Sequence, residues 1–359
     1  MVAAPTQGVV MRTWLKAFIL GCIFFVSQTA AGGRDYFLPQ PTVQKYAVIL
    51  AGASPEDKYS DQIHGWALRL YDILTKDYGY KPGQIILLMG RVDPGDVRIT
   101  GVCRREMIQD KMRALKKMLQ PGDQVFFFLL GHGTGSEDEA KFVIPGPDIT
   151  GREFAKILET LSTQDIIVVN TTSASYPFSA ALSGPGRVIV ASTRSMAERY
   201  NTIFAQFFIA ALDGHAGDRD KNRRVSMWEA FGFAGQKVKN WYTDQNRIPT
   251  EHAVLDDDGD GIFSAEPKPS AGDGRLAQIA YLDLLPSGPD THGVFSTVDA
   301  AGMRNLTAQI RMLERSVTLL RNRKEELGQE SYQKEMEALL IELARTSRKL
   351  RQMRTESGD

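Results

Sequence analysis

Five short, almost entirely apolar runs alternate with amphipathic segments between residues 46 and 242. Runs that are apolar at consecutive positions are typical of strands that are covered on both faces. The segments around them place apolar residues three or four positions apart, as in helices with one buried face. This alternation predicts an α/β domain of three layers, with a parallel sheet between two layers of helices. The strands are expected at residues 46–51, 85–89, 124–130, 166–170 and 188–192, and the helices at 63–78, 104–119, 154–161, 203–212 and 225–242.

The overall composition excludes several classes of protein. The chain has 359 residues, with 43 Lys and Arg against 43 Asp and Glu, so its formal net charge is zero. That balance argues against a sequence-wide basic surface for nucleic acid. Only two cysteines are present, Cys22 and Cys103, which excludes a disulfide framework. A hydrophobic content of 43% is ordinary for a globular protein with a buried core.

The first 31 residues resemble a secretory signal peptide. Arg12 and Lys16 precede an apolar run at residues 17–26, and small residues follow it up to Ala31, where we expect cleavage. The run is shorter than the roughly 20 apolar residues that a membrane-spanning helix needs. We therefore expect an exported protein, periplasmic or secreted. The alternative is an uncleaved segment that anchors the chain to the membrane.

The composition changes after the α/β region. An irregular stretch rich in Asp, Gly and Pro is followed by a region rich in Leu, Arg, Glu and Gln with heptad spacing of apolar residues, interrupted near Gly328. This pattern predicts an antiparallel hairpin of two coiled-coil-like helices, which either packs within the chain or mediates self-association or partner binding. The expected parts are a signal peptide (1–31), a linker (32–44), the α/β domain (45–255), an irregular connection (256–297) and the hairpin (298–359).

Two strand ends carry polar residues suited to chemistry. The strand at 124–130 leads into Gly131-His132-Gly133, and the strand at 166–170 leads into a run of Thr and Ser. Ligands bind at the carboxyl ends of strands in open parallel sheets. A His between glycines can present its imidazole to a cleft, and the neighbouring backbone N–H groups can stabilise an oxyanion. The hydroxyl groups at the second strand end are candidates for a nucleophile.

This arrangement resembles the caspase-like cysteine peptidases, and the legumain-type branch and its bacterial relatives most closely, over about residues 45–242. The resemblance implies a caspase-like fold with His132 as general base. It also implies that the N–H groups of Gly133 and of the nucleophile position stabilise the oxyanion. Asn170 stands where these peptidases carry an acidic or amide residue. The nucleophile position, however, holds Thr172 rather than cysteine.

The loss of this cysteine removes thiolate chemistry from the site, because an alcohol is not ionised near neutral pH. Cys103 lies before the second expected helix, away from both site strands, and is interpreted as a buried apolar residue. Ser173 and Ser175 are candidate binding residues. Arg194 stands with Glu198 where legumain-like enzymes contribute pocket residues, although a surface ion pair is equally compatible with the sequence.

Three hypotheses follow from these residues. The first is a pseudo-peptidase without a cofactor that binds a peptide or protein partner, and no nucleic acid, in its cleft. The second is a hydrolase in which His132 activates the hydroxyl of Thr172, Ser173 or Ser175, although no carboxylate is placed by sequence to orient the imidazole. The third is an inactive scaffold that carries the C-terminal hairpin.

Two acidic segments have partial calcium-loop patterns. Residues 218–229 place oxygen-bearing side chains at loop positions one, three, five, nine and twelve, but Arg223 occupies the position that should be Gly. Residues 256–266 match the first half of such a loop, whereas Pro267 stands at position twelve. Each segment is either a calcium site or a turn that caps neighbouring structure, and the sequence assigns no metal to either.

Overall fold

The computed structural model describes residues 35–54, 56–161, 164–285 and 297–356. The predicted signal peptide, its cleavage site at Ala31 and the first three residues of the linker (32–34) lie outside the described residues. The described residues from Tyr36 onward form one compact unit. Within the described ranges, no helix combines the length and the apolar character needed to cross a membrane.

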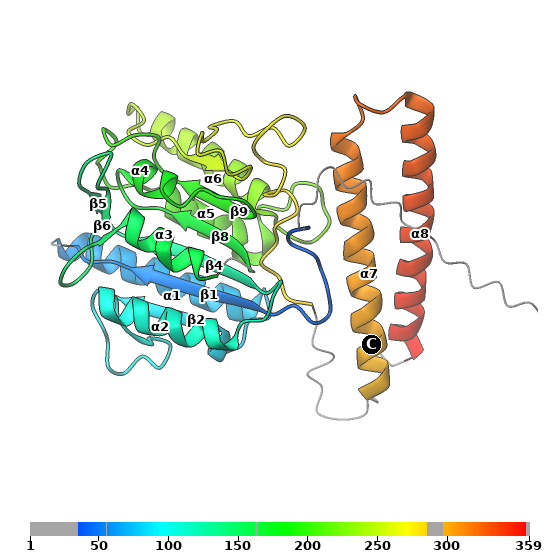
Figure 1. Ribbon diagram of the computed structural model, residues 1–359, viewed down its shortest axis with the longest axis horizontal. Coiled ribbons are helices and arrows are strands. Elements are labelled where there is room, and N and C mark those ends of the chain that lie inside the picture. Colours follow the sequence, from blue (N-terminus) through cyan, green and yellow to red (C-terminus); the bar gives the residue numbers. More distant parts are fainter. Residues whose placement is uncertain (1–34, 55, 162–163, 286–296, 357–359) are drawn as a thin grey trace, which may run out of the picture. The chain divides into compact units, whose positions relative to one another are not determined.

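A seven-stranded sheet forms the centre of the α/β region (Figure 1). Its order is β10-β9-β8-β4-β1-β2-β3, and every neighbouring pair is parallel except β9 and β10. All five predicted strands are confirmed to within one residue at each end, whereas β3 and β10 were not predicted. The strands are β1 (Lys45–Ala51), β2 (Ile85–Met89), β3 (Gly101–Val102), β4 (Gln124–Leu130), β8 (Asp165–Asn170), β9 (Arg187–Ala191) and β10 (Val254–Asp256).

Helices cover both faces of this sheet, as the apolar runs indicated. One face packs against α1, α5 and α6, and the other against α2, α3 and α4. The short helix α4 was not predicted. The helices are α1 (Asp57–Lys76), α2 (Arg105–Met118), α3 (Gly151–Glu159), α4 (Ser175–Ala180), α5 (Phe204–Leu212) and α6 (Met227–Asp244), with 3-10 turns at η1 (Pro82–Gln84) and η2 (Asp213–His215).

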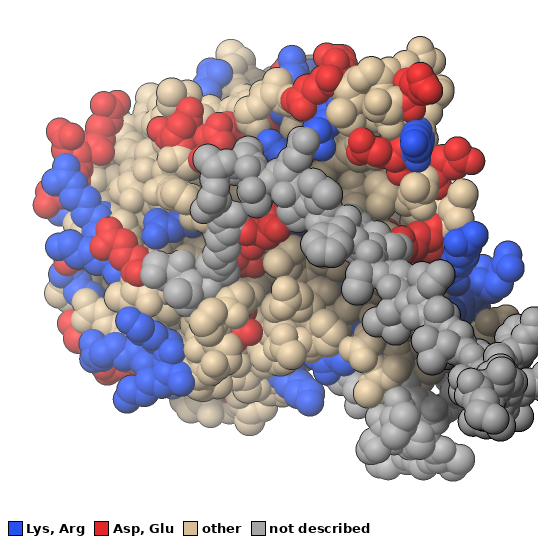
Figure 2. Space-filling view, turned by 45° about the vertical axis from the view of Figure 1, so that its right-hand side comes forward, with Lys and Arg blue, Asp and Glu red and all other residues tan. Residues whose placement is uncertain are grey.

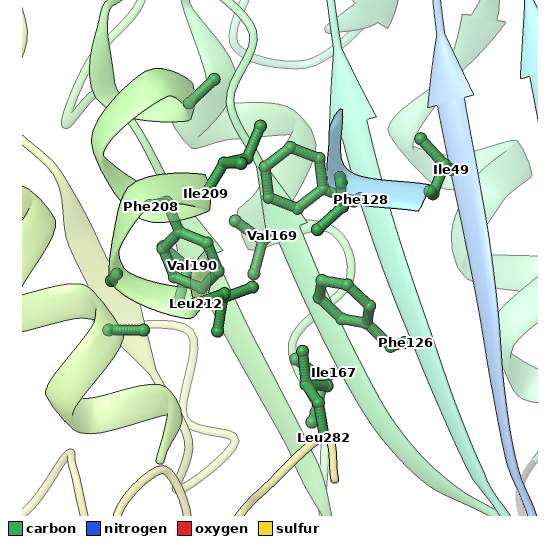
Figure 3. Close-up of a cluster of buried hydrophobic side chains, with 14 of the residues drawn as sticks. Ile49, Phe126, Phe128, Ile167, Val169, Val190, Phe208, Ile209, Leu212 and Leu282 are labelled. Atoms are coloured by element: carbon green, nitrogen blue, oxygen red, sulfur yellow. The ribbon is translucent and has the colours of Figure 1, made fainter. Parts of the chain in front are cut away.

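The pleat of β4 distributes three consecutive Phe side chains between the two faces. Phe126 and Phe128 point toward α5, where the ring of Phe208 lies 5.8 Å from that of Phe128 (Figure 3). Phe127 points to the other face and meets Phe154 of α3 with ring centroids 5.6 Å apart. Full burial of one such ring is worth about 1.5–3 kcal/mol. The core thus holds β4 in place, and β4 carries the His132 turn at its end.

A small antiparallel sheet follows the His132 turn and was not predicted. It consists of β5 (Gly133–Thr134), β6 (Lys141–Phe142) and β7 (Ile149–Thr150). Thr150 ends this sheet and caps α3, because its hydroxyl accepts the N–H of Glu153 at 3.1 Å while the Glu153 carboxylate accepts the N–H of Thr150 at 2.8 Å.

The predicted C-terminal helical hairpin is confirmed. Its helices are α7 (Thr297–Asn322) and α8 (Gln329–Glu356). Met303 and Leu306, near the start of α7, pack against Leu350 near the end of α8, so the two helices are antiparallel. Charges of both signs are interspersed over the face shown in Figure 2, in keeping with the zero net charge of the chain.

Candidate functional site

The two strand ends that carry the predicted site residues are neighbours in the sheet. β4 and β8 pair in parallel, with Leu129 opposite Asn170. His132 and Gly133 therefore follow β4 at the same edge of the sheet at which Thr172 and Ser173 follow β8. The two strand ends that carry the candidate residues are therefore adjacent.

Gly133 makes the closest approach between the two strand ends. A Cβ atom at this position would lie 2.2 Å from the Ser173 carbonyl oxygen and 3.2 Å from Thr172 Oγ1, so only glycine fits. The Gly133 N–H donates to Ser173 Oγ at 3.3 Å. The resemblance to caspase-like peptidases implies that this N–H stabilises an oxyanion. Here it instead donates to a side chain of the same protein.

The Thr172 hydroxyl is directed into the protein interior. Thr172 is 2% exposed, and its Oγ1 donates to Asn170 Oδ1 at 2.8 Å. The Thr172 N–H donates to the same oxygen at 3.1 Å. Asn170 is held in turn by a hydrogen bond from its Nδ2 to Ser179 Oγ of α4 at 3.1 Å. Both the hydroxyl and the N–H at the nucleophile position therefore serve to anchor the loop after β8.

His132 contacts a residue that the sequence did not single out. Its Nε2 lies 3.3 Å from Ser54 Oγ, and Tyr59 packs edge-on with ring centroids 6.3 Å apart. Burial lowers the pKa of His132, against a raising effect of the Glu56 charge, so the neutral imidazole is favoured. Within the described ranges, no carboxylate forms a hydrogen bond with this imidazole.

Ser54 could have been found from strand topology. It follows β1, and β1 pairs with β4 on the side opposite β8, so residues beyond Ala51 end at the site edge of the sheet. The sequence could not reveal this position because it does not fix the order of the strands.

Ser173 and Ser175 have structural partners. Ser173 is 2% exposed and receives the Gly133 N–H as described above. Ser175 is fully buried; its N–H donates to Thr193 Oγ1 at 2.7 Å, and its hydroxyl lies 3.3 Å from Ser192 Oγ. This network ties the start of α4 to the residues that follow β9.

Arg194 forms the surface ion pair that the sequence allowed. Its Nε lies 3.4 Å from Glu198 Oε1, and its side chain is 60% exposed. The Glu198 carboxylate also accepts the Arg194 N–H at 2.9 Å and contacts His252 Nδ1 at 2.5 Å. Glu198 therefore links Arg194, on the segment after β9, to His252, on the connection from α6 to β10.

A pocket of about 450 Å³ opens between the small sheet, α3 and α4. The connection from β5 to β6 contributes the exposed acidic residues Glu137, Asp138 and Glu139, and Arg152 at the start of α3 supplies a cation. Tyr176, the second residue of α4, adds an aromatic ring. The lining thus carries three carboxylates and one guanidinium, which favours a cationic group in the pocket.

Cys103 lies in the interior, as expected for an apolar residue. It is fully buried, beside Ile108 and Met112 in the core on the α2 side of the sheet. Burial raises the pKa of the Cys103 thiol above its usual range. The thiol is therefore neither exposed nor readily ionised, and Cys103 lacks the properties of a nucleophile.

Both acidic loops bring three carboxylates together. In each trio, Asp218, Asp220 and Glu229 or Asp256, Asp258 and Asp260, one oxygen of each residue lies within 4.8 Å of the others. In the first loop the carboxylates accept backbone N–H groups of the loop itself.

Asp218 accepts the N–H groups of Lys221 and Arg223 at 2.7 and 2.9 Å. Glu229 accepts those of Arg219 and Ser226 at 3.0 and 2.9 Å. The first loop is therefore braced by its own backbone.

Comparison with profiles of known protein families and with curated proteins finds no match for this chain.

Proposed function

We propose that the chain is a caspase-like, legumain-type peptidase homologue that has lost hydrolytic activity and binds a peptide or protein segment beside His132. The observation that supports this most is the engagement of both oxyanion donors inside the chain. The Gly133 N–H donates to Ser173 Oγ, and the Thr172 N–H donates to Asn170 Oδ1.

Hydrolysis at Thr172 would require several of these contacts to break. An alcohol nucleophile needs a hydrogen bond to its base, whereas the Thr172 hydroxyl donates to Asn170 at 2.8 Å and His132 contacts Ser54. Loss of a single oxyanion donor costs about 10²–10³ in kcat. Both donors are engaged here, so the arrangement favours binding over catalysis.

The acidic pocket supports a preference for basic peptides. Glu137, Asp138 and Glu139 are exposed and line the pocket together with Arg152. Glu139 also pairs with Lys141 at 3.5 Å, so Glu137 and Asp138 supply most of the uncompensated negative charge. A Lys or Arg side chain entering this pocket would gain complementary charge, and Tyr176 offers an aromatic surface for its aliphatic stem. Residues 12–31 support export, so we place this binding activity outside the cytoplasm.

Binding is tested with a library of fluorescent peptides that vary in charge at each position. Peptides with Lys or Arg should bind best, and Glu137→Gln/Glu139→Gln should weaken binding at least tenfold. The matched control, Glu106→Gln/Asp110→Asn on exposed positions of α2, should change affinity less than twofold. Equal binding of acidic and basic peptides, or equal loss in both variants, would contradict the proposal.

A second candidate is a serine hydrolase that uses Ser54. The 3.3 Å contact between Ser54 Oγ and His132 Nε2 favours it, because a neutral imidazole can accept a hydroxyl proton. In that case both Ser54→Ala and His132→Ala abolish turnover of an ester substrate. In the binding proposal both variants retain peptide affinity, and the wild-type chain has no turnover to lose.

A further inference from the structure

The last residue of β10 and the loop that follows it contain three alternate aspartates whose carboxylates lie close together. Asp256, Asp258 and Asp260 each direct an oxygen to a common point, with these atoms within 4.8 Å of one another. Asp257 faces elsewhere and accepts the N–H groups of Gly274 and Ala277 at 2.8 and 2.7 Å. Asp257 thus holds the neighbouring backbone in place, whereas the carboxylates of Asp256, Asp258 and Asp260 lie close to one another.

One oxygen of this trio is buried without a partner. Asp256 is 1% exposed, and its Oδ1 accepts the Gly259 N–H at 3.0 Å. Its Oδ2 has no hydrogen-bond partner among the described residues. A buried carboxylate oxygen without a partner is costly, and such groups commonly mark an ion or a water. The trio therefore combines convergent negative charge with an unsatisfied buried acceptor.

We propose that this loop binds one calcium ion through the carboxylates of Asp256, Asp258 and Asp260. They stand at positions one, three and five of a calcium-binding loop, and Ile262 at position seven would supply its carbonyl oxygen. Gly261, at position six, has φ of 78°, the left-handed conformation that this turn needs. The trio of carboxylates in a partly exposed loop suits calcium better than magnesium, which demands octahedral geometry.

Backbone hydrogen bonds join the residues on either side of the loop. The N–H of Ser264 donates to the Leu255 carbonyl at 2.8 Å and the N–H of Leu255 to the Ser264 carbonyl at 2.9 Å, so an antiparallel bridge joins the two ends of the loop. Pro267 at position twelve offers no carboxylate. We therefore expect a moderate dissociation constant of about 10⁻⁵–10⁻³ M.

A bound ion would brace the structure beside the acidic pocket. Gly259 packs so closely on Gly184 that an added Cβ would lie 2.8 Å from its carbonyl carbon, and the Phe263 ring meets that of Tyr176 with centroids 5.4 Å apart. The loop thus contacts both α4 and the connection from α4 to β9. Calcium is therefore expected to raise the melting temperature of the chain.

The experiment is calcium titration of the full chain by calorimetry after treatment with a chelator. The wild type should bind one calcium ion, and Asp258→Asn/Asp260→Asn, at two exposed positions, should weaken binding at least tenfold. The matched control, Asp218→Asn/Asp220→Asn in the other acidic loop, should bind calcium within twofold of the wild type.

Thermal melting gives an independent readout and checks the fold. In chelator, Asp258→Asn/Asp260→Asn should melt within about 2 °C of the wild type, and 10 mM calcium should raise the melting temperature of the wild type by about 3–8 °C but not that of the variant. The proposal is overturned by absence of calcium binding at 10 mM. It is also overturned if Asp258→Asn/Asp260→Asn binds calcium as well as the wild type does, or if only the control variant loses calcium binding. Equal affinity of the wild type for magnesium and calcium would overturn it too.

Discussion

Replacing Gly133 with Ala tests the packing of the site directly. The added Cβ would lie 2.2 Å from the Ser173 carbonyl oxygen, more than 1 Å closer than van der Waals contact. The obstacle is backbone, so either β5 or the loop after β8 must move. The move also separates the Gly133 N–H from Ser173 Oγ, which are 3.3 Å apart.

The magnitude follows from these two contacts. Overpacking of a well-filled site costs about 1–3 kcal/mol, and loss of a hydrogen bond costs about 0.5–1.5 kcal/mol. We therefore expect Gly133→Ala to lower the free energy of unfolding by about 2–4 kcal/mol.

Equilibrium unfolding in urea measures this change. The matched control is Gly65→Ala, at an exposed position of α1 where an added Cβ meets nothing within 4 Å. It should raise the free energy of unfolding by up to about 1 kcal/mol, because Ala favours helix over Gly. If Gly133→Ala stays within 0.5 kcal/mol of the wild type, on the order of an ordinary surface substitution, the close approach of the two strand ends is wrong.

Three further predictions concern single buried side chains. Thr172→Val removes the buried hydroxyl that donates to Asn170 and should destabilise the fold by about 1–2 kcal/mol without changing peptide affinity, measured by urea unfolding and fluorescence anisotropy. Burial raises the pKa of Glu251 to about 7, so the folded chain keeps a proton that the unfolded chain releases. As the pH rises from about 4.5 to 7, the wild type should therefore lose up to roughly 3 kcal/mol of stability relative to Glu251→Gln. Thermal melts of both proteins across this pH range measure the difference. Equal dependence of stability on pH in the two proteins would refute the prediction. Cys103, whose thiol pKa is raised by burial, should remain unmodified by a thiol reagent in the native protein and react in urea, as mapped by mass spectrometry.

The sequence was sufficient for the five longer strands of the sheet because these strands are buried on both faces. Runs such as the three phenylalanines of β4 allow no other placement, and the predicted bounds agree with the structure to within one residue. The heptad spacing likewise sufficed for α7 and α8. Shorter elements escaped prediction since two-residue strands such as β5 depend on neighbours rather than on periodicity.

The positions of the site residues were predicted better than their orientations. Strand ends placed His132 and Thr172 at one edge, but the direction of the Thr172 hydroxyl depends on Asn170 and on the loop geometry after β8. The contact between Gly133 and Ser173 joins residues 40 positions apart, and that between His132 and Ser54 joins residues 78 apart. No local sequence pattern predicts a contact between residues so far apart in the chain, so the contact of His132 with Ser54 was found only in the structure.

Covalent labelling tests the central claim that this site does not catalyse hydrolysis. The purified chain is treated with a broad fluorophosphonate and with peptidyl acyloxymethyl ketones, His132→Ala is treated in parallel, and an active cysteine peptidase serves as the positive control for the ketones. Mass spectrometry should find no adduct at Ser54, Thr172, Ser173 or Ser175 in either chain. An adduct on any of these residues that forms in the wild type and disappears in His132→Ala would contradict the account and identify the chain as an enzyme.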